Sequence, residues 1–235
     1  MSQLPDGLES YEFQKQLSKS SDTDSLWHLI NILKEGTLLP LLTEDGKPDK
    51  KDFSWAEMFS KEQIVELEFG SGKGGFLVDY ATKHPEINVL GSEWDPKWAH
   101  YGARRINRNN LENAKLLRGD IFYFVRDYIP DSSLNAAHMY FPDPWPKKKH
   151  HKNRLLRPDF LVELQRVLKP DSFFYWGTDH QEYNELSVEL FENTEFIDVV
   201  EKNTASPTDG IMTNFEAKYI EEGRPIYRSV LQFRK

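Results

Sequence analysis

From residue 61 onward, the sequence alternates short apolar runs with segments of helical periodicity, and this alternation constrains the fold most strongly. It is typical of βαβ units that build a mostly parallel sheet. The apolar runs predict strands at residues 64–69, 87–94, 115–118, 135–141 and 172–178, and two late strands at 196–200 and 226–233. Helices are predicted at residues 76–83 and 96–109, after Arg157, and around Leu186 to Phe191. We therefore expect an α/β fold with a mostly parallel seven-stranded sheet, helices on both faces, and the two late strands as an antiparallel pair.

The length and composition suit one sizeable domain with a smaller addition. The chain has 235 residues, of which 38% are hydrophobic, so it can bury a substantial core. No apolar run approaches the roughly 18 residues of a membrane helix, and the N-terminus lacks a signal-peptide pattern. We expect a soluble, cytoplasmic protein without membrane contact. The chain has no cysteine and its histidines lack metal-ligand spacing, so we also expect no bound metal.

Residues 1–60 read as an acidic N-terminal extension that precedes the main domain at 61–235. They hold 6 Lys/Arg against 11 Asp/Glu. Apolar residues from Leu26 to Leu33 follow helical spacing before Gly36, which predicts an amphipathic helix. We expect this helix to dock on its own domain rather than on a partner. A charged linker is predicted from Thr43 to Asp52.

A glycine-rich turn joins the first predicted strand of the domain to its helix. Gly70, Gly72 and Gly75 match the spacing G-x-G-x-x-G, which lets the backbone approach a ligand at a helix N-terminus. The spacing alone is also compatible with a purely structural turn. Its position between a strand and a helix favours a ligand site.

Three carboxylates end three successive predicted strands. Glu68 lies two residues before Gly70, where it suits a ligand with an ammonium group better than a pyrophosphate, and this favours S-adenosylmethionine over NAD. Glu93 follows Gly70 by 23 positions and can accept from ribose hydroxyls. Asp120 could accept from the adenine amino group. Each could instead be a solvated strand end or a helix N-cap, but three together favour a cofactor site.

The block from Phe141 to Arg154 joins a rigid turn to a cationic run. Prolines on both sides of Asp143 fix the backbone outside helical geometry, directly after an apolar run that predicts a buried strand. Asp143 is thus expected at a strand's carboxyl end, where open α/β sheets bind ligands. Residues 147–157 then contain six Lys/Arg, two His and no acid. Such a run can be a plain solvated loop, although its join to the turn favours chemistry beside a polyanion.

With these motifs in place, the chain resembles the bacterial tRNA (guanine-N7)-methyltransferase family over roughly residues 62–235. The resemblance is carried by residues 68–74, the block 141–154, the Gly-Thr-Asp sequence at 177–179, and the block Thr213 to Tyr219. It implies a class I methyltransferase (Rossmann-like) fold with S-adenosylmethionine as cofactor and tRNA as partner. The implied cofactor contacts are Glu68, Gly70, Gly72, Gly74, Glu93, Asp120 and Asp143. The implied guanosine contacts are Lys147, Asp179, Thr213, Asn214, Phe215 and Glu216. The implied RNA contacts are Lys149, His150, His151, Lys152 and Arg154.

The expected chemistry needs no strong base, because guanine N7 already has a free lone pair. Asp143 is expected to be catalytic by orienting the purine and offsetting the positive charge that develops on it. Asp179 and Glu216 could accept from guanine N1 and N2, and Trp145 could stack on a base or simply pack. Alternatives are a methyltransferase of the same fold acting on another RNA or on a small molecule, a non-catalytic RNA-binding relative, and a nicotinamide oxidoreductase.

Overall fold

A computed structural model describes residues 31–34, 37–39, 53–202 and 210–234. The strands are β1 (Asn31–Lys34), β2 (Thr37–Leu39), β3 (Ile64–Phe69), β4 (Ile87–Glu93), β5 (Ala114–Arg118), β6 (Leu134–Tyr140), β7 (Leu168–Thr178), β8 (Ile197–Lys202) and β9 (Tyr227–Phe233). The helices are α2 (Trp55–Met58), α3 (Gly75–Lys83), α4 (Pro96–Arg108), α5 (Ile121–Asp127), α6 (Pro158–Val167), α7 (Gln181–Glu192) and α8 (Asn214–Glu221), with the 3₁₀ helix η2 (Lys148–Asn153).

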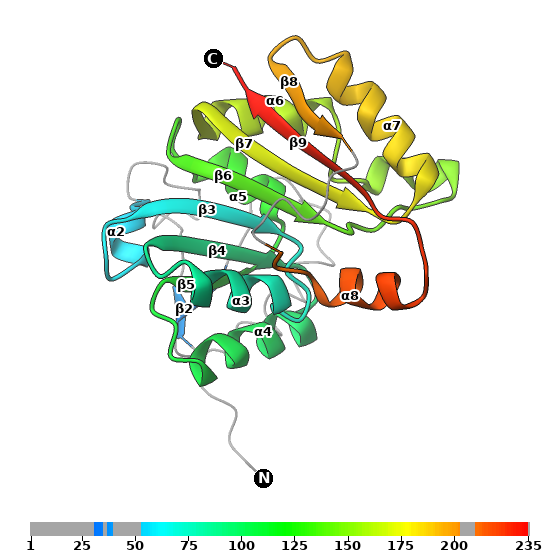
Figure 1. Ribbon diagram of the computed structural model, residues 1–235. Coiled ribbons are helices and arrows are strands. Elements are labelled where there is room, and N and C mark those ends of the chain that lie inside the picture. Colours follow the sequence, from blue (N-terminus) through cyan, green and yellow to red (C-terminus); the bar gives the residue numbers. More distant parts are fainter. Residues whose placement is uncertain (1–30, 35–36, 40–52, 203–209, 235) are drawn as a thin grey trace, which may run out of the picture.

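The strands form one sheet in the order β2-β1-β5-β4-β3-β6-β7-β9-β8 (Figure 1). The central strands β5, β4, β3, β6 and β7 pair in parallel, whereas β9 pairs antiparallel with both β7 and β8. The carboxyl ends of the five parallel strands therefore meet at one edge. Ligands bind at this edge in open α/β sheets.

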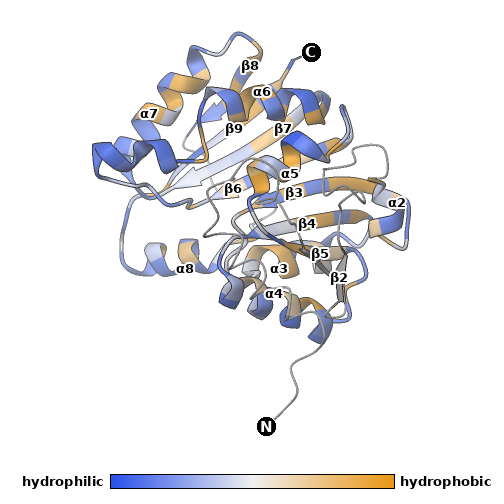
Figure 2. Cartoon of the chain, turned by 180° about the vertical axis from the view of Figure 1, so that it is seen from behind, coloured by the Kyte–Doolittle hydropathy of each residue, from blue (hydrophilic) through white to orange (hydrophobic). Residues whose placement is uncertain are grey.

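Helices cover the sheet on both faces, and each face has its own core. Helices α3 and α4 pack over β4 and β5 in the smaller core, which includes Phe76, Leu77 and Leu116. Helices α5, α6 and α7 pack on the opposite face in the larger core, which includes Phe124, Phe160 and Phe191. Seen from behind in Figure 2, β3 and β4 carry hydrophobic segments interrupted by hydrophilic ones, and α5 is partly hydrophobic. The alternation of side chains along each strand places Leu116 in one core and its neighbour Leu117 in the other.

The seven predicted strands are all present in the predicted class of sheet, with boundaries that differ by a few residues. Two short strands, β1 and β2, extend the sheet beyond β5. The prediction that an amphipathic helix extends to Leu33 is wrong at this residue, because Leu33 lies in strand β1 and pairs with Leu116 of β5. Pairing with the exposed edge of β5 supplies backbone hydrogen bonds that a helix would have made internally. The rest of that helix, residues 26–30, lies outside the described residues, as does the predicted linker.

The packed unit begins before residue 61. Phe53, Met58 and Phe59 are buried in the larger core, so α2 and its flanks belong to the same body as the sheet. Helices α5 and α8 were not among the predicted elements. Among the helices that the structure describes, none is long and apolar enough to cross a membrane.

Candidate functional site

The sheet register brings the predicted carboxylates to one edge. Glu68 of β3 lies opposite His138 of β6 and Gly91 of β4. Glu93 is the last residue of β4, and Asp120 follows β5 by two residues. Asp143 and Asp179 follow β6 and β7, which are neighbours in the sheet. Five strand ends therefore present the acidic residues around a common edge.

The glycine turn is shaped by Gly70 and Gly72 and held by Glu93. Both glycines have positive φ, 75° and 52°, and a Cβ built on either would meet no atom within 4 Å among the described residues. The space in front of the turn is thus open to a ligand. The Gly72 amide donates to Glu93 Oε2 at 2.8 Å, and the Asp95 amide donates to Glu93 Oε1 at 2.8 Å. Glu93 therefore ties the turn to the end of β4.

Glu68 is a buried carboxylate with unused hydrogen-bonding capacity. The residue is 3% exposed, and its buried Oε2 has no hydrogen-bond partner within the described part of the chain. Burial raises the pKa of Glu68 to about 7, and the negative charge of Glu93 acts in the same direction. A cationic group placed beside Glu68 would offset both effects. The site is therefore prepared for a ligand that carries a positive charge.

Two further predicted site residues, Asp120 and Gly74, are the N-caps of helices at this edge. Asp120 is the N-cap of α5 and accepts from the Phe122 amide at 3.0 Å, so one of its carboxylate oxygens is committed to the helix. Gly74 is the N-cap of α3 with φ of 66°, and a Cβ there would lie 3.1 Å from Gly102 Cα of α4. This close approach sets how α4 packs beside the turn.

The Pro-Asp-Pro turn is held in an unusual backbone conformation at both ends. Phe141 and Trp145 have positive φ, 52° and 44°, although neither is glycine. Such conformations cost of order 1–3 kcal/mol each and persist where the surroundings enforce them. The Phe141 amide donates to Gly177 O of β7 at 2.7 Å. Between these anchors the Asp143 side chain is exposed to solvent.

Arg154 lies inside the protein and supports this turn. It is 6% exposed, its Nε donates to Pro144 O at 2.7 Å, and its guanidinium stacks over the Tyr183 ring at 4.5 Å. This position does not suit the phosphate contact expected from the sequence. The Arg154 side chain instead links the Pro-Asp-Pro turn to α7 within the protein interior. Its place in a cationic run gave no signal of this role.

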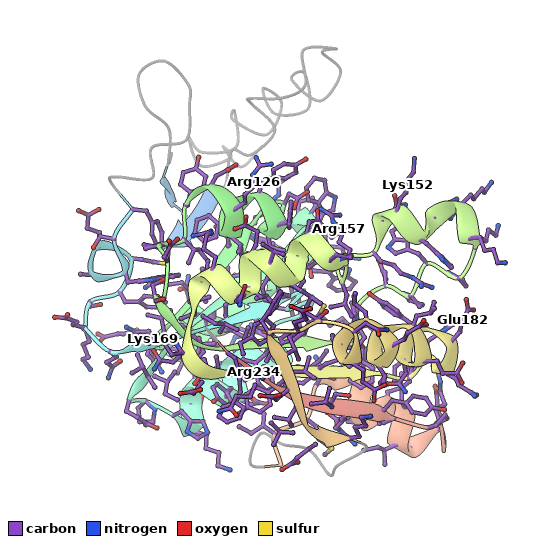
Figure 3. All side chains as sticks on the ribbon, turned by 90° about the horizontal axis from the view of Figure 1, so that it is seen from above. Arg126, Lys152, Arg157, Lys169, Glu182 and Arg234 are labelled. Carbon is purple, nitrogen blue, oxygen red and sulfur yellow. The ribbon has the colours of Figure 1, made fainter. Side chains whose placement is uncertain are left out.

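The remaining cations of the block face solvent on or just before η2. Lys147, Lys148, Lys149 and Lys152 are exposed, and His150 and His151 are half-buried. Figure 3 shows Lys152 projecting away from the body of the protein. Trp145 packs edge-on against His150 with ring centroids 5.9 Å apart. Lys147, Lys148, Lys149 and Lys152 form no ion pair among the described residues, so their positive charge is available to an anion.

The acceptors predicted to recognise guanine are already paired with arginines. Asp179 forms an ion pair with Arg224, and Glu216 forms one with Arg228. Glu216 is 4% exposed, and its amide donates to Thr213 Oγ1, the N-cap of α8, at 3.0 Å. The arginines come from the chain after α8 and were not singled out in the sequence, because nothing local marks such long-range pairs. They hold both acceptors in place at the edge.

The other two residues predicted to contact guanosine lie on the first turn of α8. A Cβ built on Gly75 of α3 would lie 2.8 Å from Asn214 Nδ2, so α8 packs closely against the N-terminus of α3. Phe215 is 52% exposed. Asn214 therefore has a packing role, whereas the Phe215 ring is free to meet a substrate.

A buried polar network lies behind the site. Glu66 accepts from Tyr80 Oη at 2.9 Å and contacts His138 Nε2 at 2.8 Å, while His138 Nδ1 lies 3.1 Å from Tyr140 Oη. Burial alone would raise the pKa of Glu66, but the hydrogen bond and charge of His138 hold it below its ordinary value. The network fixes Tyr140 at the point where β6 enters the Pro-Asp-Pro turn. No cluster of three or more metal-ligating side chains occurs in the described ranges.

Comparisons with known proteins agree with this arrangement. Residues 62–229 match a family described as "Putative methyltransferase". The chain is 32% identical over 184 residues to the tRNA (guanine-N(7)-)-methyltransferase of Geobacillus kaustophilus, covering 77% of this chain and 84% of the relative. It is also 32% identical over 203 residues to the protein of that name from Myxococcus xanthus, covering 85% of this chain and 96% of the relative.

Solved structures with the same fold include rRNA methyltransferases. The 16S rRNA methyltransferase KamB aligns with a TM-score of 0.56 at 14% identity, covering 79% of this chain and 96% of that one. A 30S ribosomal A1408 methyltransferase from an uncultured bacterium aligns with a TM-score of 0.55 at 17% identity, covering 87% and 99%. At such identities the likeness establishes the class I methyltransferase fold alone.

The family match covers most of the chain, and the relatives align over most of their own length. The glycine turn, the carboxylates at the strand ends and the Pro-Asp-Pro turn all lie within the matched residues. The chain therefore belongs to the tRNA (guanine-N7)-methyltransferase family.

Proposed function

We propose that this protein transfers a methyl group from S-adenosylmethionine to N7 of a guanosine in tRNA. The observation that carries the proposal is the meeting of three features at one sheet edge. Buried Glu68 and the open glycine turn can receive a cationic cofactor, exposed Asp143 follows the adjacent strand, and unpaired lysines follow Asp143.

The residues present fit S-adenosylmethionine. The Glu68 Oε2 atom, which has no hydrogen-bond partner in the described part of the chain, suits the ammonium group of the cofactor, and the open space at Gly70 and Gly72 suits close approach of the cofactor to the backbone. Gly74 shapes the same turn. Glu93, Asp120 and Asp143 supply further acceptors around it for the ribose, the adenine amino group and the amino acid part. When bound, the cofactor supplies an electrophilic methyl group on a sulfonium.

Catalysis by this chain rests on alignment and electrostatics rather than on proton transfer. The N7 lone pair of guanine can attack without prior deprotonation. Asp143, fixed by the prolines and by the anchors at Phe141 and Trp145, orients the purine and offsets its developing positive charge. The rigid turn places this carboxylate before the substrate arrives, so little reorganisation is needed during the reaction.

Guanine is selected by acceptors that the arginines hold ready. The guanine N1–H and N2–H₂ donors approach Asp179 and Glu216 and share these carboxylates with Arg224 and Arg228. Adenine lacks both donors at the corresponding positions and would leave the acceptors unmatched. The remaining contacts to the nucleoside come from Lys147, Thr213, Asn214 and Phe215, with the exposed Phe215 ring available for stacking.

The RNA backbone is held by the exposed cations of η2. Lys149 and Lys152 neutralise phosphates, and the half-buried His150 and His151 lie beside them as further RNA contacts, so tRNA affinity falls as salt rises. The reacting guanosine must be presented unstacked to reach the edge. A protein with this substrate is expected to act in the cytoplasm, which fractionation followed by immunoblotting would test.

The direct test is incubation of the purified protein with methyl-labelled S-adenosylmethionine and total tRNA, followed by nucleoside analysis. The proposal predicts label in 7-methylguanosine. Label in any other nucleoside, or in no nucleoside under conditions where the cofactor binds, would overturn it.

A further inference from the structure

The outer surface of α4 carries a second group of cations, separate from η2. The helix contains Lys97, Arg104, Arg105 and Arg108 and no Asp or Glu. Its buried residues Ala99, Gly102 and Ile106 face the smaller core. The exposed positions Lys97, Tyr101, Arg104 and Arg108 follow one another at spacings of four, three and four residues, so they form a single stripe. This stripe is about 17 Å long at 1.5 Å per residue.

None of the four cations of α4 forms an ion pair within the described residues. Several other exposed cations do, such as Lys61 with Glu112 and Lys202 with Glu192. The chain as a whole is acidic, with 30 Lys/Arg against 38 Asp/Glu, so the stripe is a local concentration of positive charge. The same lack of ion pairs marks the lysines of η2. The α4 stripe therefore has the electrostatic character of the loop that the proposed function assigns to RNA.

Lys73 from the glycine turn adds a further cation at the N-terminal end of the stripe. Lys73 Nζ and Lys97 Nζ lie 4.9 and 4.7 Å from the centroid of the Trp98 ring, and each ammonium is attracted by the aromatic face. Arg105 Nη1 donates to Lys73 O at 3.3 Å and connects the turn to the helix. These contacts hold Lys73 beside α4, so the positive charge of the stripe continues onto the glycine turn.

The two cationic surfaces lie on either side of the catalytic edge. Helix α4 packs over β4 and β5, whereas η2 follows β6 and its Arg154 reaches α7 on the opposite face. From β5 to β7 there are four strand spacings, about 19 Å. Figure 1 shows α4 near the β5 side of the sheet and α7 near the β7 side. A polyanion that touched both surfaces would cross the edge where Asp143 lies.

We infer that the α4 stripe, with Lys73, is a second RNA-binding surface that holds the sugar-phosphate backbone of the tRNA away from the target guanosine. The inference rests on the proposed function. Tyr101, which is 50% exposed, adds a ring and a hydroxyl for contact with the same backbone. The bound tRNA thus spans the carboxyl edge of the sheet, with η2 beside the target and α4 beyond the cofactor.

The test is the double variant Arg104→Ala/Arg108→Ala, measured for tRNA affinity as a function of salt and for methylation kinetics. Two lost phosphate contacts should reduce the magnitude of the slope of log K against log salt by about 1.4 to 1.8. They should also weaken tRNA binding about tenfold near 0.1 M salt and raise KM for tRNA with kcat nearly unchanged. A short hairpin bearing the target guanosine should be methylated equally well by variant and wild type.

The matched control is Lys61→Ala/Lys202→Ala, which removes the same charge from two ion-paired surface positions. This control should leave the salt slope of tRNA binding unchanged. Arg104→Lys/Arg108→Lys keeps both positive charges on α4 and should show the wild-type slope. An unchanged slope and Kd in the folded alanine variant, or an equal loss in the control, overturns the α4 surface. Failure of wild-type protein to methylate any tRNA would instead count against the proposed function.

Discussion

Glu68 offers the sharpest quantitative prediction, because its burial links cofactor affinity to pH. The pKa of this carboxyl is raised from 4.5 to about 7, and each unit corresponds to about 1.4 kcal/mol. Holding the ionised form in the unliganded protein therefore costs about 3 kcal/mol. Because the folded pKa is raised, the corresponding stability is present below pH 4.5 and is lost as pH rises through 7.

A bound ammonium group favours the ionised carboxylate, so cofactor binding should weaken as Glu68 becomes protonated. The ionised fraction of a group with a pKa near 7 falls by a factor of about 25 between pH 7.5 and 5.5. Titration calorimetry with S-adenosylmethionine should show the dissociation constant rising by about that factor. Glu68→Gln should bind S-adenosylmethionine weakly at both pH values, with little pH dependence. This result would assign the pH dependence to Glu68 rather than to Glu93 or Asp120.

The same substitution should stabilise the unliganded protein at high pH. Denaturant unfolding at pH 8 should give Glu68→Gln a free energy of unfolding up to about 3 kcal/mol above wild type, and the difference should vanish near pH 4. A single pH profile of cofactor binding shared by wild type and variant would exclude Glu68 as the titrating group. Equal stability of the two proteins at pH 8 would also contradict it.

Three further substitutions test the turn and its supports. Asp143→Ala should lower kcat at least about 100-fold with unfolding changed by under about 0.5 kcal/mol, since the side chain is exposed; near-normal turnover would exclude its catalytic role. Arg154→Ala should lower the free energy of unfolding, measured with denaturant, by about 2–3 kcal/mol. The substitution leaves Pro144 O without its donor and removes the stacking of the guanidinium on the Tyr183 ring. It should leave the salt slope of tRNA binding unchanged, and a reduced slope would show an RNA contact after all. Gly91→Ala should lower the free energy of unfolding by about 1–3 kcal/mol, because the new Cβ would lie 2.6 Å from Leu77 Cδ2. An unchanged melting temperature would contradict this packing.

The sheet could be predicted because each central strand carries its own local pattern. Segments such as Ile64–Phe69 and Ile87–Glu93 are rich in apolar residues, have strand length, and are followed by turn residues. The short helix α5 was missed because only seven residues separate Asp120 from Tyr128. Leu33 was misplaced because apolar spacing over a few residues suits both a helix and an edge strand, and only pairing with β5 decides between them.

Much of the candidate site could be located from the sequence, whereas the partners of its residues could not. Glu68, Glu93 and Asp143 were placed at strand ends by the elements before them. The ion pairs of Asp179 and Glu216 join residues 45 and 12 positions apart, and no local pattern reports such contacts. Arg154 shows the same limit, because a buried arginine and a solvated one look identical within a basic run.

The central claim is that N7 of guanosine accepts the methyl group at the edge formed by Glu68, Asp143 and η2. Its most direct test uses tRNA transcripts in which 7-deazaguanosine replaces guanosine, so that a carbon stands at the position of N7. These transcripts should bind with near-normal affinity but accept no labelled methyl group, while unmodified transcripts are methylated. Methyl transfer to the 7-deazaguanosine transcripts at the rate of the unmodified RNA would contradict it.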